Sequence, residues 1–470
     1  MKKSKLHLHL LEQAAKLHRS SGWSRLKPRR LFRVLKASDC ILMNAYQVAS
    51  NQPVTDLDTD GGSLDLGPFL YRLHHPPLGL KLLTHAFVKA MESAEGQALP
   101  PSQFTPETWK AMTELVKKEG IAGPGGEIFR NGKYEQLDPM WNFALFMFVV
   151  HELGLAEHHP FGDTPNIIEV PTGRNIRIAV LGDWGTGKFG KRGGPAVAVM
   201  KGIEQLRPDY IIHLGDVYYA GTGPEESDFL LDLWPTRLGR NRSFTLNSNH
   251  EMYDGATGYF KMALKKDGPF GAQQQTSYFA LRHAEWLLLG LDSAYYSSPK
   301  KLFMNGSIGG ADGAQGAWIR ENFKDQDPEK LVVFTHHSPA GIAGDEITGM
   351  DDPNSLWNEV VTALGNKTPG AWYFGHIHNA AVYSKNSALG KAGCKGRLVG
   401  HGAIPYGKSF KLSESYASDL VTYYPKTPLE KDKLRIRNGF AIIDIDAGGV
   451  LAESFYEVAD GLDKASRVWP

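Results

Sequence analysis

The chain has 470 residues, with 52 Lys and Arg against 51 Asp and Glu and a formal net charge of +1, so its charge gives no reason to expect a nucleic acid or an acidic membrane as partner. This length predicts two or three domains and a large core that needs no crosslinks. The only cysteines are Cys40 and Cys394, which excludes a disulfide framework and a thiolate metal cluster. The basic start of the chain is not followed by an apolar core, and the most apolar window, residues 140–150, is too short to span a bilayer. We therefore expect a cytoplasmic protein without a membrane span.

The first part of the chain reads mainly as helices separated by proline and glycine. One predicted helix is capped by Thr105, has Pro106 in its first turn and ends at Gly120. Residues 56–61 resemble the start of a calcium-binding loop, but Gly67 replaces the glutamate needed at its twelfth position, so we interpret them as an acidic loop. The composition turns to Pro, Gly, His and Asp between 156 and 175. We therefore predict an N-terminal, mainly helical region of unknown role over 1–165 and a second domain over 175–465.

After this boundary the pattern changes to alternating strands and helices. The apolar strand 176–181 ends in Gly-Asp, with Asp183, and the strand 210–212 leads to Gly-Asp, with Asp216. The helix between them begins near Pro195, so the two strands are predicted to be parallel and both aspartates to emerge at the same edge of one sheet. A carboxylate such as Asp216 can bridge two cations, and Tyr219, three residues on, could reach one of them if its phenol is ionised.

Three later strands end in the same way. Residues 243–246 lead to Asn249 and His250, residues 331–335 to His336 and His337, and residues 371–374 to His376 and His378. Each end alone is typical of a turn or a structural histidine. Together, oxygen and imidazole ligands at the carboxyl edge of one sheet are what a site for two cations requires.

These strand ends form five motifs in order. They are Gly-Asp-Trp-Gly at 182–185, Gly-Asp-x-x-Tyr at 215–219, Asn-His-Glu at 249–251, Val-x-x-His at 333–336 and Gly-His-x-His at 375–378. The series resembles the calcineurin-like metallophosphoesterases over about residues 176–460, and its tyrosine places it near the purple acid phosphatases. The resemblance implies an α/β fold of two mixed β-sheets packed face to face with flanking helices, an αββα sandwich, in which 438–445 and 451–458 are closing strands of the second sheet.

The resemblance also implies a ligand set. The first metal would be held by Asp183, Asp216, Tyr219 and His378. The second would be held by Asp216, Asn249, His336 and His376. His250 would stand beside the substrate as a hydrogen-bond donor or acid. Spacing from the strand selects His336 at the fourth motif, whereas spacing to Pro339 would select His337.

The charges of this set bear on which metals fit it. Two aspartates, a tyrosinate and a bridging hydroxide carry four negative charges, so one trivalent and one divalent ion would leave a net positive site for phosphate. Ionising a phenol at neutral pH also requires a strong Lewis acid. We therefore expect two metal ions, iron in the first site and iron, zinc or manganese in the second.

The function implied is metal-dependent hydrolysis of a phosphate-ester substrate by a metal-bound hydroxide, foremost of monoesters. A phosphodiesterase on the same site is an alternative, because Asp345 and Glu346 stand where related phosphatases often have another histidine. A metal-binding scaffold or sensor with little turnover is the alternative from another class. The sequence does not indicate the oligomeric state.

Overall fold

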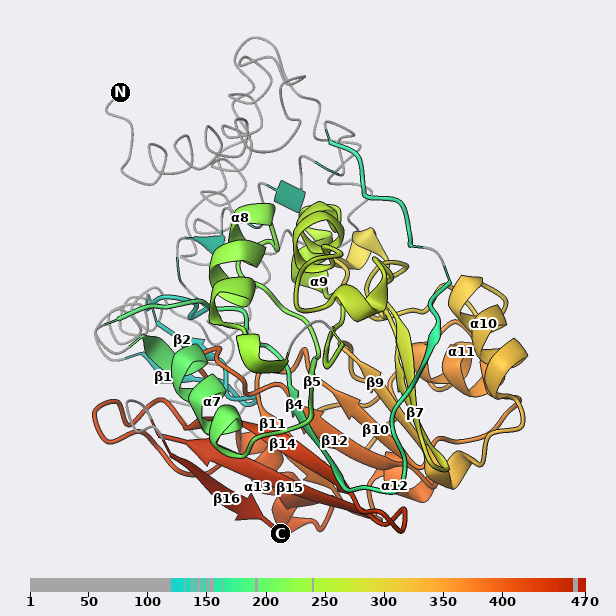
Figure 1. Cartoon of the computed structure of the whole chain (residues 1–470). Coiled ribbons are helices and arrows are strands. Elements are labelled where there is room, and N and C mark those ends of the chain that lie inside the picture. The colour runs from blue at the N-terminus through green and yellow to red at the C-terminus, as the bar shows by residue number, and fades with distance from the viewer. Residues whose placement is uncertain are drawn as a thin grey trace.

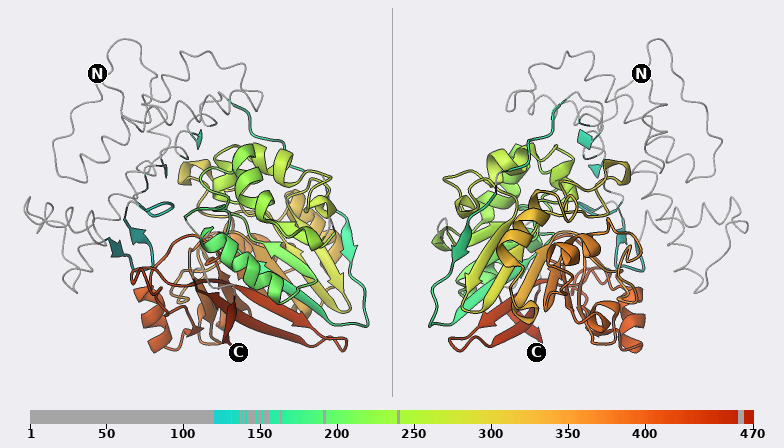
Figure 2. Two further views of the ribbon diagram at one scale, coloured as in Figure 1. Left: turned by 60° about the vertical axis from the view of Figure 1, so that its left-hand side comes forward. Right: turned by 90° about the vertical axis from the view of Figure 1, so that its right-hand side faces the viewer.

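The computed structural model describes residues 120–470, apart from 131, 137, 139, 142–143, 145–146, 149–150, 152–155, 163, 191–192, 239–240 and 460–463. The predicted N-terminal helices and the acidic loop at 56–67 lie outside the described residues. Two mixed sheets face each other, as Figures 1 and 2 show, with helices on their outer sides. The predicted α/β sandwich is thereby confirmed.

One sheet has eight strands in the order β13-β11-β12-β10-β9-β8-β7-β3. Its strands are β3 (Ile167–Glu169), β7 (Phe279–His283), β8 (Trp286–Gly290), β9 (Leu331–Thr335), β10 (Ala371–Phe374), β11 (Ala380–Tyr383), β12 (Lys395–Val399) and β13 (Val421–Tyr423). The central strands β8, β9, β10 and β12 are parallel, whereas β7, β11 and β13 pair antiparallel with a neighbour. The strands β8, β9 and β10 are almost entirely apolar because both of their faces are covered, whereas β12 carries Lys395 and Arg397.

The other sheet has six strands in the order β16-β15-β14-β4-β5-β6. Its strands are β4 (Ile176–Leu181), β5 (Tyr210–His213), β6 (Ser243–Thr245), β14 (Asn438–Ile445), β15 (Leu451–Val458) and β16 (Ala465–Trp469). The strands β4, β5 and β6 are parallel, while β14 runs antiparallel to β4. The one polar residue of β4, Arg177, is accommodated because its guanidinium pairs with Asp444 of β14 at 2.7 Å.

Seven α-helices lie wholly within the described residues, and several of them pack on the outer faces of the two sheets. The seven helices are α7 (Gly194–Gln205), α8 (Gly223–Glu225), α9 (Asn249–Met252), α10 (Ala314–Phe323), α11 (Leu356–Ala363), α12 (Ala388–Lys391) and α13 (Phe410–Ala417). Apolar residues of α7 pack on the six-stranded sheet, and those of α10 and α11 pack on the eight-stranded sheet (Figure 1). A third core, built from both sheets, fills the space between them. None of the described helices is long and apolar enough to cross a membrane.

The connection through α7 explains how the first two site residues meet. The helix begins with Pro195 in its first turn and joins the parallel strands β4 and β5, as the sequence predicts. Trp184, just after β4, donates its indole N–H to the carbonyl oxygen of Ala196 at 2.9 Å. The helix is therefore fixed against the ends of both strands, and those ends carry Asp183 and Asp216.

Candidate metal centre

The predicted site residues come from the carboxyl ends of strands in both sheets. Asp183 and Asp216 follow β4 and β5 of the six-stranded sheet, and an isolated parallel bridge between Gly185 and Val217 holds the two ends together. His336 follows β9 of the eight-stranded sheet. The expectation that all ligands share the edge of one sheet is therefore wrong, since the site lies where the edges of two packed sheets meet.

Asp183 is buried and tightly enclosed. Its Oδ2 accepts the backbone N–H of His376 at 3.0 Å. A Cβ on Gly375 or Gly400 would lie 2.7 or 2.8 Å from that same oxygen, so only glycine leaves room for the carboxylate. Its Oδ1 is buried and has no hydrogen-bond partner among the described residues. Burial, and then the charge of Asp216, raise the pKa of Asp183 well above its ordinary value. Such an oxygen is costly unless a cation faces it.

Asp216 lies at the centre of the group. Its Oδ1 accepts the hydroxyl of Ser248 at 2.7 Å, and its Oδ2 accepts the hydroxyl of Tyr218 at 2.6 Å. Burial opposes ionisation of this carboxyl, but the imidazoles of His250, His336 and His378 hold its pKa well below the ordinary value. Asp216 is therefore the ionised member of the aspartate pair and faces residues of both halves of the predicted ligand set.

An amide oxygen and two imidazoles gather on one side of Asp216. His336 Nε2 lies 2.9 Å from Asn249 Oδ1 and 3.1 Å from His376 Nδ1, and His376 Nδ1 lies 3.1 Å from the same amide oxygen. The other ring nitrogen of His336 lies 3.0 Å from the carbonyl of Leu214, to which it donates. Burial lowers the pKa of His336 and of His376 well below the ordinary value. Both rings are therefore neutral, which is the form that binds metals.

His337 competes with His336 for this role. Its ring nitrogen comes within 4.8 Å of nitrogens of His336 and His376. However, its Nδ1 lies 2.8 Å from the Ser293 hydroxyl and its Nε2 lies 2.7 Å from the carbonyl oxygen of Phe303. Both ring nitrogens of His337 are thus occupied by protein groups, and the placement favours His336 as the ligand.

The structure places Tyr218, and not Tyr219, with the predicted ligands. The Tyr218 hydroxyl lies 2.6 Å from His378 Nε2, and this nitrogen lies 3.5 Å from both Asp183 Oδ1 and Asp216 Oδ2. The hydroxyl of Tyr219 instead donates to Asp138 Oδ2. The expected contribution of Tyr219 to the first metal therefore has no support in the position of its side chain, because Asp138 already accepts its hydroxyl proton.

His250 is held beside the group with a defined orientation. Its Nδ1 lies 2.7 Å from the carbonyl oxygen of Tyr219, to which it donates, and its Nε2 lies 3.9 Å from Asp216 Oδ1. The ring packs against Tyr218, with centroids 4.2 Å apart, and against Trp141 at 5.4 Å. Burial lowers the pKa of His250, while the charge of Asp216 opposes that shift. Nε2 is thus the ring atom available for proton exchange on the Asp216 side.

The sequence assigned no role to two residues that support Asp216, Ser248 and Glu251, although Glu251 is the last residue of the Asn-His-Glu motif. Glu251 accepts the backbone N–H groups of Asp216 and Val217 through Oε1, both at 3.1 Å, and its other oxygen contacts the hydroxyl of Ser248. Burial, and then the charge of Asp216, raise the pKa of Glu251 to about 8. A protonated Glu251 can donate to Ser248, which then donates to Asp216, so each hydroxyl in this chain has one acceptor.

The donor set fits metal ions. Ligand atoms of Asp183, Asp216 and His336 all lie within 4.8 Å of one another. With the unpartnered Oδ1 of Asp183 and the shared position of Asp216, hard oxygens and neutral imidazoles lie on both sides of one carboxylate. Most of this group is buried, but the side chain of His378 is 21% exposed. Solvent therefore reaches the group from the loop that carries His378.

Comparison with known proteins agrees with the motifs. Residues 176–380 match the family model described as calcineurin-like phosphoesterase, which confirms the predicted resemblance for this segment. No curated protein matches the chain significantly. Among solved structures, GAP50, titled the anchor in the inner membrane complex of Plasmodium, is similar with 16% identity and a TM-score of 0.39, covering 63% of this chain and 89% of that one.

A second solved structure is purple acid phosphatase PPD1 from seeds of yellow lupin (Lupinus luteus). It is 16% identical with a TM-score of 0.38, and the match covers 64% of this chain and 55% of that one. Both structural likenesses are weak, so the assignment of residues 176–380 rests on the family model together with the order of the strands.

Proposed function

We propose that this chain, whose residues 176–380 match the family model described as calcineurin-like phosphoesterase, hydrolyses phosphate monoesters with a pair of metal ions. One observation carries the proposal. Carboxylate, amide and imidazole groups from five strand ends converge, and the buried Oδ1 of Asp183 among them has no hydrogen-bond partner among the described residues. A protein that used these groups only for packing would leave that oxygen desolvated without compensation.

The two sides of Asp216 define which residues would hold each ion. Asp183 and His378 lie on one side, and Asn249, His336 and His376 lie on the other. When bound, two such cations would neutralise phosphate oxygens and lower the pKa of water toward 7, which supplies a nucleophile at neutral pH. Asp216 would keep the ions close together because its two oxygens face opposite halves of the ligand set.

His250 is the residue proposed for proton transfer. Because its Nδ1 is committed to the carbonyl oxygen of Tyr219, Nε2 is the atom that would exchange a proton with the leaving oxygen of the ester. Trp141 and Tyr218 pack on its ring and limit its rotation. The imidazole is therefore presented in one orientation, as a general acid or base requires.

The proposed metals are iron on the Asp183 side and iron, zinc or manganese on the His336 side. Iron on the Asp183 side requires a phenol within reach of that ion, and the Tyr218 hydroxyl lies 2.6 Å from Asp216 Oδ2 and from His378 Nε2. Burial, and then the charges of Asp216 and Asp183, raise the pKa of Tyr218 well above its ordinary value. Only a strong Lewis acid such as ferric iron would ionise this phenol at neutral pH.

Metal analysis and activity on one purified sample test the proposal. We expect close to two bound metal ions per chain and hydrolysis of an aryl phosphate monoester faster than of the corresponding diester. Asp216→Asn should lose metal and lower kcat by at least roughly two orders of magnitude, whereas His250→Ala should keep the metals and lose most of the rate. Asp312→Asn, at an aspartate that is 93% exposed, is the matched control and should match the parent protein in both measurements.

Other outcomes would select the alternatives. Faster hydrolysis of the diester would identify a phosphodiesterase on the same site. Bound metal with no turnover on either ester would identify a scaffold or sensor. Protein that neither binds transition metals nor hydrolyses either ester would overturn the proposal.

A further inference from the structure

A cavity of about 250 Å³ lies beside the candidate metal centre. One wall is Ile377, which stands between the proposed ligands His376 and His378 in the chain. Another wall, residues 340–342, belongs to the loop that follows His336 and His337. The cavity thus borders the loop through which solvent reaches the site, because His376 and His378 are partly exposed.

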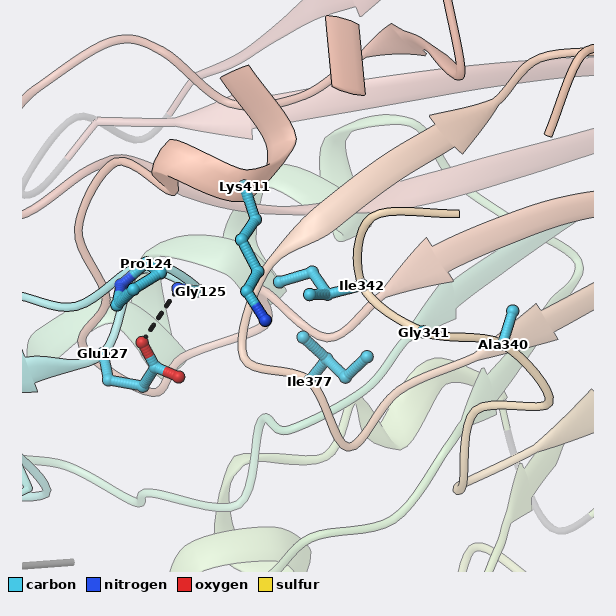
Figure 3. A pocket seen from close by; sticks show the side chains of 8 residues that line it. All are labelled: Pro124, Gly125, Glu127, Ala340, Gly341, Ile342, Ile377 and Lys411. Atoms are coloured by element: carbon cyan, nitrogen blue, oxygen red, sulfur yellow. Dashed lines mark hydrogen bonds between the residues drawn. The ribbon is translucent and has the colours of Figure 1, made fainter. Parts of the chain in front are cut away.

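The remaining walls come from distant parts of the chain. Pro124, Gly125 and Glu127 belong to the turn between β1 (Ile121–Ala122) and β2 (Ile128–Phe129), and Lys411 lies in the first turn of α13. In Figure 3, the Lys411 side chain reaches from α13 across the cavity toward Ile377.

Hydrogen bonds fix these walls in place. The backbone N–H of Lys411 donates to the carbonyl oxygen of Pro124 at 3.0 Å, and the side-chain amide of Asn379 donates to that of Gly125 at 2.9 Å. On the opposite wall, the hydroxyl of Tyr383 donates to the carbonyl oxygen of Ile342 at 3.1 Å. The cavity is therefore formed before any ligand arrives, which lowers the entropic cost of binding.

The size and lining of the cavity restrict its ligand. At about 30 Å³ per water in the liquid, it has room for roughly eight waters, below the usual ~300–1,000 Å³ of drug-sized pockets. Ala340, Ile342 and Ile377 supply apolar surface. A benzene ring or a short aliphatic group fits such a space, which is too small to enclose a protein segment or a nucleotide.

Two charged side chains, Glu127 and Lys411, line the cavity, and they differ in the interactions that their charged groups make. One carboxylate oxygen of Glu127 accepts the backbone N–H of Gly125 at 3.0 Å within the same turn. Lys411 is exposed, and within the described part of the chain its ammonium group has no ion-pair partner. Lys411 is therefore the less engaged of the two charged groups.

We infer that this cavity holds the alcohol part of the substrate, and that the preferred substrates are phosphate esters of a small, partly apolar alcohol that carries a carboxylate. This inference rests on the proposed function, because the ester phosphate must lie at the metal centre. The apolar part then packs on Ile342 and Ile377, and the carboxylate faces the ammonium group of Lys411. The same arrangement disfavours large or polyphosphorylated alcohols, for which the cavity has no room.

Three phosphate esters that share the same phenyl ring test this assignment. They are phenyl phosphate, 4-carboxyphenyl phosphate and 4-(aminomethyl)phenyl phosphate, and kcat/KM is measured for each with the metal-loaded full chain. We expect the carboxylated ester to be preferred. Lys411→Met should lower the ratio of kcat/KM for the carboxylated ester to that for phenyl phosphate by roughly 1.5-fold to fivefold, the range for an exposed charge pair. Comparing the same ratio in both proteins cancels the different reactivities of the leaving groups.

The matched control is Lys391→Met. Lys391 is an exposed lysine of α12 that does not line the cavity, and its removal changes the net charge equally. Its ratio should equal that of the parent protein, and the effect of Lys411→Met should shrink as salt is added.

The possible outcomes separate the inference from the proposed function. A ratio that Lys411→Met leaves unchanged, or a preference for the ammonium ester, overturns the inference while hydrolysis of phenyl phosphate upholds the function. If the metal-loaded protein hydrolyses none of the three esters, the proposed function fails and the inference falls with it.

Discussion

Three of the proposed metal ligands have an unusual backbone conformation. Asp183, Asp216 and His376 have φ values of 56°, 88° and 67°, in the left-handed region that residues with a Cβ rarely adopt. Such conformations cost on the order of 1 kcal/mol each or more and persist where the surroundings impose them. Here the surroundings are the two strand edges, and the strained backbone directs all three side chains into one group.

The two adjacent tyrosines show how far a motif determines a single residue. Tyr218 and Tyr219 follow the end of β5, beyond the region where side chains alternate between the faces of a sheet. Sequence spacing alone therefore could not decide which phenol faces the metals. Asp138 decides it in the structure by accepting the Tyr219 hydroxyl, and Tyr134 stacks on the Tyr219 ring at 4.9 Å between centroids.

Phenylalanine substitutions at the two tyrosines provide a direct test. Tyr218→Phe removes the hydroxyl between Asp216 and His378, so we expect a lower metal content and, with iron bound, loss of the visible absorption of a phenolate-metal bond. Tyr219→Phe should keep both properties and lower the free energy of unfolding by about 1–3 kcal/mol, because it removes a buried hydrogen bond to the Asp138 carboxylate. Metal analysis, absorption spectra and urea titration measure these effects. The reverse result, colour lost only in Tyr219→Phe, would restore the prediction made from the motif.

At the scale of elements, strand ends were the most predictable feature. The sequence identifies β4, β5, β6, β9 and β10 as apolar runs that end in polar ligands, and parallel strands bring such ends to one edge. Which sheet each strand joins could not be predicted, because an apolar run does not specify the strand with which it pairs. β4, for example, pairs with β14 from near the end of the chain, and the site is shared between two sheets.

The short helix α9 links strand geometry to the site. Ser248 precedes it with extended backbone, φ −134° and ψ 178°, and its hydroxyl oxygen accepts the backbone N–H of His250 at 3.0 Å. The same hydroxyl donates to Asp216. This extended backbone does not require a glycine. Serine therefore serves as a helix cap and as a support for the central carboxylate.

Two substitutions at Ser248 separate these roles. Ser248→Ala loses the cap and the bond to Asp216, so we expect the free energy of unfolding to fall by about 1 kcal/mol and metal affinity to fall roughly tenfold. Ser248→Gly is a better cap than alanine and should lose less stability, but it lacks the hydroxyl and should show the same metal defect. Urea titration and competition with a chelator measure the two quantities. Parent-like metal affinity in Ser248→Gly would show that the hydroxyl does not position Asp216.

At the scale of the whole molecule, Arg130, Glu135 and Trp141 connect the site with residues 432–435, which precede β14. Trp141 lies against His250, while Glu135 pairs with Arg130 and Arg435 at 2.8 and 2.7 Å. Arg130 also pairs with Asp432. This arrangement could not be predicted from the sequence, because the segment lies outside the phosphoesterase motifs and single acidic or aromatic residues have no diagnostic spacing. Long-range ion pairs depend on the completed fold.

This cluster predicts how stability responds to acid. The Glu135 side chain is fully buried, and although burial opposes ionisation, Arg130 and Arg435 hold its pKa below the ordinary value of 4.5. The unfolded chain therefore binds a proton at this residue more readily than the folded protein does. The contribution of Glu135 is fully present above pH 4.5 and is lost as pH falls through the lowered pKa of the folded state.

We expect the urea midpoint of the parent protein to decrease between about pH 5 and pH 3 as the proton bound by the unfolded state favours unfolding. Glu135→Gln should be less stable at pH 7, because it leaves two arginines without their shared partner, and its midpoint should fall less over the acid range. Asp312→Asn removes a carboxylate that is 93% exposed in its pair with Arg320, so it should follow the parent curve. Parallel acid profiles for Glu135→Gln and the parent would show that this buried cluster does not control acid stability. The segments around Glu135 and Arg435 would then be held together by packing alone.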